Sequence, residues 1–315
     1  MSERYLTFAS WCKNRYGRKL YRTALNAGMT CPNRDGTIGD RGCIFCAGGS
    51  GDFAIRYEGQ KLSPEDMIFN HQDVSYGDYI AYFQAYTNTY APVERLRRLF
   101  ESALEDPVFA GISIATRPDC MGEDVIALLK ELKERFPEKL FMIELGLQTI
   151  HEESAQLIRR GYPLSVFDEC VRRLHEIDID IVVHVIIGLP HETPEMIYET
   201  IDYLNDSKIQ GIKLQLLHYL KGTDLGDLYQ NDPESFHVLS IEEYAEIVAE
   251  CIGRLDESIV VHRISGDGNG EYLLAPLWSK DKRRVLNLIS HTLKVKNITQ
   301  GCRRKYEQER NSEAA

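Results

Sequence analysis

The sequence has no long uninterrupted run of apolar residues. Its longest apolar stretch, 181–189, is broken by His184 and Gly188 and is far shorter than the roughly 20 residues that span a bilayer. The first thirty residues contain no apolar segment followed by a small-residue cleavage pattern. Low-complexity tracts are also missing. We therefore expect a globular, cytoplasmic protein without membrane contact.

The cysteines do not form the pattern of a disulfide scaffold. Eight in 315 residues is few for such a scaffold, and a cytosol keeps thiols reduced. Three of them, Cys31, Cys43 and Cys46, fall within sixteen positions, so this segment is the place to look for metal or redox chemistry. The other five stand singly, where a cysteine is usually a small buried apolar residue: Cys12, Cys120, Cys170, Cys251 and Cys302.

The sequence also lacks the overall positive charge common among nucleic-acid-binding proteins, since its formal net charge is −11. Two segments depart from this average. Residues 1–22 contain six Lys/Arg and one Glu, and residues 279–305 contain nine Lys/Arg and one Asp. An acidic body with two basic ends is compatible with local phosphate binding, although solvated helix faces explain the same charges equally well.

Short apolar segments alternate with amphipathic ones along most of the chain. In 123–136, for example, apolar residues recur at three- and four-residue spacing, which predicts a helix. Successive β-then-α units require parallel strands with right-handed crossovers. Periodicity alone leaves an open doubly wound sheet and a complete or partial barrel as alternatives. Six segments are predicted to be strands: 20–27, 79–86, 111–115, 140–147, 179–187 and 211–218.

The simplest domain division has three parts. Residues 1–22 form a basic N-terminal segment, 23–257 the β/α domain, and 258–315 a C-terminal extension. Within the extension, 259–264 has the pattern of a further strand and 282–295 that of a basic amphipathic helix.

The three clustered cysteines follow the first predicted strand. Cys43 and Cys46 are a CxxC pair, whose spacing lets two thiolates bind one metal centre, and Cys31 precedes Cys43 across eleven residues rich in glycine. Structural zinc would need a fourth ligand, and the sequence has no second CxxC or paired His. A redox CxxC normally lacks a third cysteine. A 4Fe–4S cluster with three cysteine ligands and one open iron fits the odd number best, because the open iron binds a cofactor.

At these residues the sequence resembles the radical S-adenosylmethionine (SAM) superfamily. Cys43-Ile-Phe-Cys46 matches the second half of its cysteine motif, with Phe45 in the aromatic position, whereas eleven residues before Cys43 replace the usual three. The longer gap is similar to that of the Elongator catalytic subunit and of the bacterial YtqA/YhcC group. The likeness extends over nearly the whole chain, in motifs at successive strand ends: Cys31–Gly39, Thr116–Asp119, Glu144–Thr149, Arg160–Gly161 and Gly188–Pro190.

The resemblance implies a partial (β/α)6 TIM-type barrel of parallel strands and two cofactors, a 4Fe–4S cluster and SAM. Gln148 and Arg160 match a Gln and an Arg that contact SAM in related enzymes, where an Arg fork suits the methionine carboxylate. Glu144 lies within an apolar strand, where a carboxylate costs free energy unless it is satisfied, so a contact with SAM is more plausible than a core position.

Three further positions depart from the family pattern. His184 stands where relatives often have an acidic ribose contact, although a satisfied core histidine is an equal alternative. Gln84 falls in the segment expected to bind the SAM amino group, without the usual glycines. Ala115 replaces a Glu that relatives have before Arg-Pro-Asp, so one SAM contact must be absent or moved.

The resemblance also implies a reaction. The YtqA-like group is associated with the wobble uridine of tRNA, where the carboxymethylaminomethyl side chain becomes aminomethyl. The expected partners are tRNA, held by the basic segments 1–22 and 279–305, and an electron donor such as flavodoxin or ferredoxin. Two alternatives stay open: a radical SAM enzyme acting on a peptide or small metabolite, and a non-enzymatic zinc-bound RNA-binding module.

Overall fold

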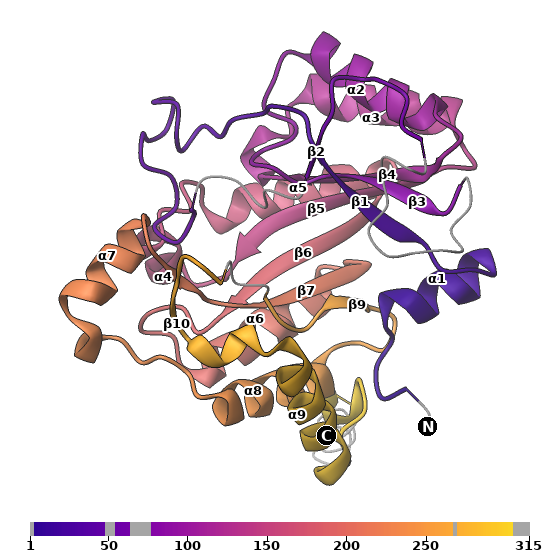
Figure 1. The fold of residues 1–315 in the computed structure, drawn as a ribbon. Helices are drawn as coiled ribbons and strands as arrows, with labels where there is room; N and C mark the ends of the chain where they lie inside the picture. The colour runs from indigo at the N-terminus through magenta and orange to yellow at the C-terminus, as the bar shows by residue number, and fades with distance from the viewer. Residues whose placement is uncertain (1–2, 48–53, 64–76, 267–269, 305–315) are drawn as a thin grey trace.

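The structure is a computed structural model that describes residues 3–47, 54–63, 77–266 and 270–304. In these residues the main sheet has eight strands, all parallel, in the order β2-β1-β3-β4-β5-β6-β7-β9 (Figure 1). The six predicted strands are present as β1 (Tyr21–Asn26), β3 (Tyr79–Phe83), β4 (Phe109–Thr116), β5 (Leu140–Gln148), β6 (Asp180–Ile187) and β7 (Gly211–Leu216). The edge strands are β2 (Ile55–Arg56) and β9 (Val260–Arg263).

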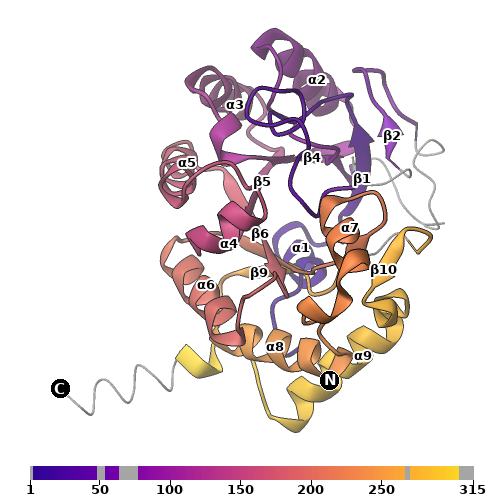
Figure 2. The same cartoon turned by 90° about the vertical axis from the view of Figure 1, so that its left-hand side faces the viewer.

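The strand order decides between the two architectures that periodicity left open. Apart from the short β2, the strands join the sheet in chain order, without the reversal that a doubly wound sheet shows at its switch point. Seen from the side of Figure 2, the strands are surrounded by helices on their outer face. Within the described residues β2 and β9 do not pair with each other, so the sheet is a partial barrel, as predicted.

The outer helices bury one apolar stripe each. In α2, apolar residues at three- and four-residue spacing place Leu96, Leu99, Phe100, Ala103 and Leu104 against the sheet, all almost fully buried. The same pattern recurs around the barrel, which is why these helices could be predicted. They are α2 (Val93–Glu105), α3 (Glu123–Arg135), α5 (Leu164–Glu176), α6 (Pro194–Asp206) and α8 (Ile241–Arg254).

Smaller elements gather at the carboxyl ends of the strands. The antiparallel pair β8 (Tyr219–Leu220) and β10 (Leu273–Ala275) lies beyond the end of β7, next to α7 (Figure 2). Sequence periodicity did not reveal these short elements, because two or three residues are too few for a pattern. They are accompanied by α4 (Glu152–Leu157), α7 (Asp224–Asn231), η2 (Pro118–Cys120), η3 (Pro233–Ser235) and η4 (Leu277–Lys280).

The C-terminal extension folds against the barrel. Its predicted strand is β9, which pairs with β7, and its predicted helix is α9 (Lys282–Val295), which packs on α8. Val285, Ile289 and Leu293 form the buried stripe of α9 and leave its basic residues on the outer side. Residues 305–315 of the extension lie outside the described residues.

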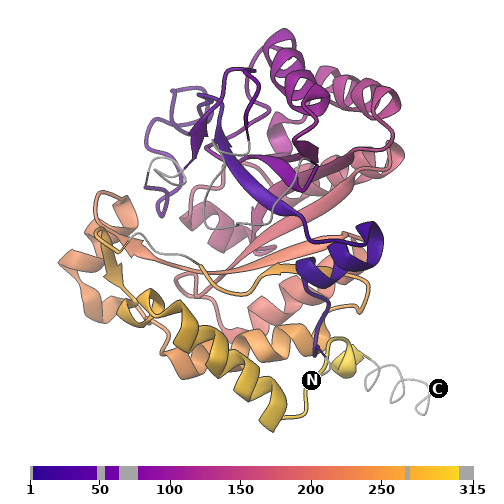
Figure 3. The same cartoon turned by 45° about the vertical axis from the view of Figure 1, so that its right-hand side comes forward.

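An N-terminal helix that the sequence did not reveal closes the opposite end of the barrel. In Figure 3, α1 (Phe8–Tyr16) lies at the end of the strands away from the cysteine-bearing loop. Its Cys12 is fully buried in an apolar cluster with residues from four strands or their starts: Leu20, Ile80, Leu140, Met142 and Val182. Just before the helix, Thr7 forms a parallel bridge to Val261 of β9.

This placement gives most of the basic N-terminal segment internal partners. Arg4 donates to the Ile298 carbonyl, and Arg15 and Arg18 pair with Asp180 and Asp78 respectively. The sixth basic residue, Arg22, points into the barrel from β1. Four of the six cations of 1–22 thus stabilise the fold at the end remote from the cysteines. Within the described residues, no helix is both long and apolar enough to cross a membrane.

Candidate active site at the carboxyl ends of the strands

The loop after β1 carries Cys31, Cys43 and Cys46, all partly exposed. Its path depends on two close contacts. Gly42 has a φ of +76°, and a Cβ there would lie 2.9 Å from the Arg34 side chain, so this position requires glycine. The buried Asn33 donates to the Arg159 carbonyl at 2.7 Å and lies 3.5 Å from the Cys43 sulfur. Asn33 therefore ties the cysteine loop to the segment that follows α4.

The three thiols lie close enough to act on one another's protonation. Burial raises the pKa of Cys43 to about 11, with further contributions from the neighbouring thiolates of Cys46 and Cys31. The Arg117 guanidinium and the hydrogen bond from Asn33 oppose this effect at Cys43. A second guanidinium, that of Arg34, interacts with Cys46 and Cys31 and donates to the Cys46 carbonyl. A metal that binds these sulfurs must displace their protons, and both cations favour the resulting thiolates.

The donor set fits an iron–sulfur cluster held by three cysteines. Three thiols on one glycine-rich loop, with two nearby arginines, match the ligands and the charge compensation that such a cluster requires. No group of three His, Cys, Asp or Glu side chains in the described ranges is gathered tightly enough to hold a metal ion. The cluster assignment therefore rests on the donor chemistry and its place in the fold, not on a preformed cage.

Of the seven non-glycine residues with positive φ in the described chain, three lie after β3, at the end of β5 and after α4. Tyr86, Gln148 and Arg159 are non-glycine residues with φ values of 63°, 71° and 56°. Tyr86 follows β3, Gln148 ends β5, and Arg159 follows α4, whose segment holds the cysteine loop. At Gly146 a Cβ would lie 2.8 Å from the Gln148 amide nitrogen, so the glycine is needed for the position of that side chain. Such conformations cost of order 1–3 kcal/mol each and are typical of functional sites.

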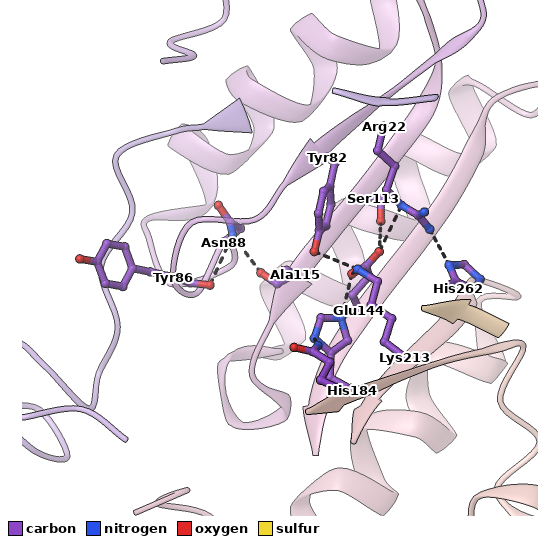
Figure 4. A network of polar contacts seen from close by, with 11 residues as sticks. Arg22, Tyr82, Tyr86, Asn88, Ser113, Ala115, Glu144, His184, Lys213 and His262 are labelled. Carbon is purple, nitrogen blue, oxygen red and sulfur yellow. Dashed lines mark hydrogen bonds and ion pairs between the residues drawn. The ribbon is translucent and has the colours of Figure 1, made fainter. Parts of the chain in front are cut away.

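Below the loop, the barrel interior contains a buried carboxylate surrounded by donors (Figure 4). Glu144 of β5 is 1% exposed and accepts hydrogen bonds from Ser113 Oγ and His184 Nε2, both at 2.9 Å. It also forms ion pairs with Lys213 Nζ and, at 3.7 Å, with Arg22 Nε. Burial opposes the charge on Glu144, but Lys213, His184 and Arg22 together outweigh it, so the pKa of Glu144 lies well below the ordinary value. The carboxylate is ionised, and both of its oxygens have partners within the barrel.

Neighbouring groups complete this layer. The Lys213 ammonium lies 3.1 Å from the Tyr82 hydroxyl and 4.6 Å from the centre of its ring. Burial lowers the pKa of Lys213 to about 8. His262 of β9 contacts Arg22 through Nδ1. Each of β1, β3, β4, β5, β6, β7 and β9 thus contributes one polar side chain to the same level of the barrel.

Between the Glu144 layer and the carboxyl ends of the strands, the barrel interior is accessible to solvent. Alternate residues of a strand face the same side of the sheet. Ala115 therefore faces the barrel interior as Ser113 does on the same strand, and Gly146 faces it as Glu144 does. Both are partly exposed, although they lie in the middle of the sheet. Gln84, Gln148 and Gln215 are partly exposed as well. The carboxyl half of the barrel is therefore an open site with mostly neutral polar walls.

The predicted SAM-contacting residues fall into three groups. Gln84 directly follows β3 and Gln148 is the last residue of β5, so both lie at the carboxyl ends of the strands. Glu144 and His184 lie in the layer below and are bonded to each other. Phe45 packs against the apolar cluster that includes Ile44, Ile158, Leu189 and Leu225.

Arg160 is more deeply buried than a ligand-binding side chain usually is. Only 2% of it is exposed, and its guanidinium donates to the carbonyls of Tyr162 and Thr149 at 3.0 and 2.7 Å and pairs with Glu152. In the structure it therefore stabilises the segment behind the cysteine loop. Its contact with SAM stays a prediction.

Sequence inspection missed several residues of the site. Arg117 is held by two hydrogen bonds to Asp119, at 2.9 and 2.7 Å, within the Thr-Arg-Pro-Asp motif. Burial disfavours its charge, but Asp119 and the nearby cysteines raise its pKa overall. Lys213 is a lone cation in an apolar strand, and the argument applied to Glu144 would have found it.

A parallel partial β/α barrel with three thiols on the loop after its first strand belongs to the enzymes that place their reactive centre at the carboxyl ends of the strands. Comparison with known families specifies the class. The Radical SAM superfamily model matches residues 34–204, and the Radical SAM C-terminal domain model matches 209–295. This chain belongs to the radical SAM superfamily.

Its relatives include proteins of similar length. YtqA of Bacillus subtilis is 42% identical over 302 residues, which cover 95% of this chain and 92% of YtqA. YhcC of Escherichia coli is 33% identical over 269 residues, 85% of each chain. Among solved structures, Methanocaldococcus infernus Elp3 with an N-terminal deletion has a TM-score of 0.59 at 16% identity, covering 70% of this chain and 55% of that one. The last likeness supports the fold alone.

The buried histidine makes a testable prediction about stability. Burial, followed by the Lys213 ammonium, lowers the pKa of His184 to about 4 from the ordinary 6.5. Between these values the unfolded chain binds a proton that the folded protein does not, so stability is lost as the pH falls from about 6.5 towards 4. From pH 7 to pH 5 this loss amounts to about 2 kcal/mol for one histidine.

Urea denaturation at pH 7 and pH 5 measures the effect. The His184→Gln variant should lose less stability between the two pH values than the unsubstituted protein does. Part of the dependence should remain, because the pKa of His262 is also lowered by burial. His291→Gln, at an exposed position of α9, is the matched control and should behave like the unsubstituted protein. An unchanged pH dependence in His184→Gln would show that the folded protein does not hold His184 neutral.

Proposed function

We propose that Cys31, Cys43 and Cys46 hold a 4Fe–4S cluster, and that SAM binds at the iron they leave open. When bound, the cluster supplies an electron that cleaves SAM to a 5′-deoxyadenosyl radical, which removes a hydrogen atom from the substrate. The observation that carries the proposal is the three-thiol loop with Arg34 and Arg117 beside it, at the open end of a radical SAM barrel. The electron comes from a reductant such as flavodoxin or ferredoxin.

The residues of the open site then hold SAM and keep water from the radical. Gln84 and Gln148 lie at strand ends where their amides bond the polar groups of SAM, and Phe45 provides an apolar contact beside the cluster. Arg160 binds the carboxylate of the SAM methionine, and for this its guanidinium exchanges its hydrogen bond to the Thr149 carbonyl for one to the carboxylate. Glu144 and His184 lie one layer lower, bonded to each other, and bound the SAM site from below.

The cluster is tested by comparing two cysteine variants. Anaerobically reconstituted protein should be brown, with the visible absorbance of an iron–sulfur cluster, and added SAM should alter the electron paramagnetic resonance signal of the reduced cluster. Cys43→Ala should lose the colour. Cys120→Ala is the matched control, since this thiol lies near Cys31 but outside the loop, and it should remain brown. A colourless protein with one zinc ion would favour the RNA-binding module instead.

For the substrate, we propose the wobble uridine of tRNA, whose carboxymethylaminomethyl group becomes aminomethyl. Removal of a hydrogen atom from the methylene between the secondary amine and the carboxylate would leave a carbon radical. Return of one electron from this radical to the cluster would give a protonated imine, and its hydrolysis by water would release a two-carbon oxo acid and leave the aminomethyl group. Distant similarity supports a tRNA substrate. A tRNA uridine(34) acetyltransferase of Methanocaldococcus jannaschii is 24% identical over 159 residues, which cover 50% of this chain and 28% of that protein.

Nucleoside analysis of tRNA tests this substrate. A strain without the protein should accumulate carboxymethylaminomethyluridine and lose the aminomethyl product. Restoring the unsubstituted gene should reverse the change, whereas Cys43→Ala should not. If the modified nucleosides at the wobble position are identical in both strains, tRNA is not the substrate. The radical chemistry would then act on a peptide or a small metabolite.

An exposed surface near the open end suits an RNA backbone. Leu277 of η4 and Tyr272 beside β10 are 60% and 47% exposed, and the cations Lys280, Arg283 and Arg284 follow on η4 and the start of α9. All three cations are exposed. Cations bind phosphates, and an exposed aromatic ring stacks on unpaired bases. We propose that this surface, rather than residues 1–22, binds tRNA.

Charge reversal tests the surface. The double variant Arg283→Glu/Arg284→Glu should weaken tRNA binding by about tenfold or more at moderate salt and reduce its salt dependence, because two phosphate contacts are lost. Lys130→Glu/Lys208→Glu, on exposed positions outside η4 and α9, makes the same change in net charge and should have a smaller effect. Equal losses in both double variants would mean that net charge, not this surface, governs binding.

A further inference from the structure

Gln215 of β7 is a polar side chain of the open site to which the proposed chemistry assigns no task. It follows Lys213 by two positions and so faces the same side of the sheet, above the Glu144 layer. Its Nε2 lies 2.9 Å from His184 Nδ1. The residue is partly exposed, and in the described part of the chain its side-chain oxygen accepts no hydrogen bond.

A chain of hydrogen bonds determines which way the Gln215 amide faces. Glu144 is ionised and accepts from His184 Nε2 at 2.9 Å, so the histidine proton must be on Nε2. In a neutral imidazole the other nitrogen, Nδ1, is then an acceptor, and of the two ends of the Gln215 amide it is the nitrogen that can donate to it. The Gln215 oxygen is thereby directed away from His184, as a hydrogen-bond acceptor whose orientation Glu144 controls across the barrel.

The surroundings of this acceptor indicate the kind of group it binds. Two positions beyond the Glu144 layer, the inward residues of the central strands are Ala115, Gly146 and Ile186, which carry no charge, and Ile186 pairs in register with Gln215. Neutral amides suit the edge of an uncharged base better than they suit a charged metabolite, because a buried charge needs an opposite charge close to it.

We propose that the Gln215 side-chain oxygen accepts a hydrogen bond from the ring N–H of the substrate uracil and so helps to select this base. Gln215 is a specificity-determining residue, and Glu144 and His184 are positioning residues that act through it. The inference rests on the proposed tRNA substrate and adds which atom of the base is recognised. Cytosine lacks this N–H and presents an acceptor at the same position, so it would leave two acceptors facing each other.

Binding of two synthetic RNAs tests the contact without catalysis. Both are anticodon stem-loops with 5-carboxymethylaminomethyluridine at the wobble position, and one carries a methyl group on ring N3. The unsubstituted protein, with cluster and SAM, should bind the methylated loop about five- to tenfold more weakly, which corresponds to one lost hydrogen bond. Gln215→Leu should bind both loops within about twofold of each other. Gln230→Leu, at an exposed position of α7, is the control and should discriminate normally.

The outcomes separate this inference from the proposed function. If the unsubstituted protein binds both loops equally well, the Gln215 contact is wrong and the tRNA substrate stands. If it binds neither loop, both proposals fail. If Gln215→Leu discriminates as well as the unsubstituted protein, another residue recognises N3, and the inference is again wrong.

A second measurement tests the hydrogen-bond chain and does not depend on RNA. In Gln215→Glu a carboxylate faces His184 Nδ1 and favours the imidazolium, so the pKa of His184 should rise from about 4 by roughly 1–3. The charged groups already facing this ring are Glu144 from β5, Lys213 from β7 and Arg263 from β9, and the substitution leaves them unchanged. Nitrogen-15 NMR of the imidazole reports both the pKa and the tautomer. An Nδ1-protonated ring in the unsubstituted protein would refute the chain.

Discussion

The parallel direction of the strands is the constraint on which the rest of this structure depends. Because consecutive strands from β1 to β7 point the same way, every connection from a strand to the next helix starts at one end of the barrel. The cysteine loop after β1, Tyr86 after β3, the Arg117–Asp119 pair after β4 and Gln148 of β5 meet there although they are far apart in sequence. The parallel strand topology therefore brings the residues of the candidate site together.

The buried Glu144 divides the barrel into two halves with different functions. Below it, α1 and an apolar cluster around Cys12 close the amino end. Above it, the inward positions are small or neutral and remain accessible. Placing a carboxylate at this depth is costly, and the cost is offset by Lys213, His184, Ser113 and Arg22 together. The layer thus forms a polar floor whose hydrogen bonds set the orientation of the side chains that face the open half.

The region around the cysteines combines strain with positive charge. Tyr86, Gln148 and Arg159 adopt backbone conformations that are unfavourable for their residue types, and Asn33 ties the loop to the Arg159 carbonyl. Arg117 lies beside Cys43, whose pKa burial raises, and Arg34 lies beside Cys46 and Cys31. A loop held in this way, with cations in place, would lose little entropy on binding the proposed cluster, and the neighbouring charges would favour deprotonation of its thiols.

The sequence by itself determined the alternation of strands and helices, because periods of two and 3.6 residues are local properties of the chain. It also identified the cysteine triplet, whose spacing is local too, and the family motifs at the strand ends. Glu144 stood out in the sequence as a carboxylate in an apolar strand, but its partners could not be named. Lys213, His184 and Arg22 come from three other strands, and no pattern along the chain records which strands become neighbours.

Only the tertiary structure decided several other features. The basic residues of 1–22 resemble those of 279–305 in composition, yet Arg22 enters the barrel whereas Arg283 stays on the surface. Arg160 matched a ligand-binding pattern, and its burial against the Thr149 and Tyr162 carbonyls depends on how the segment after α4 turns back. The orientation of the Gln215 amide follows from a proton position on His184, which Glu144 imposes from a different strand. Such features depend on long-range contacts, and these exist only once the chain has folded.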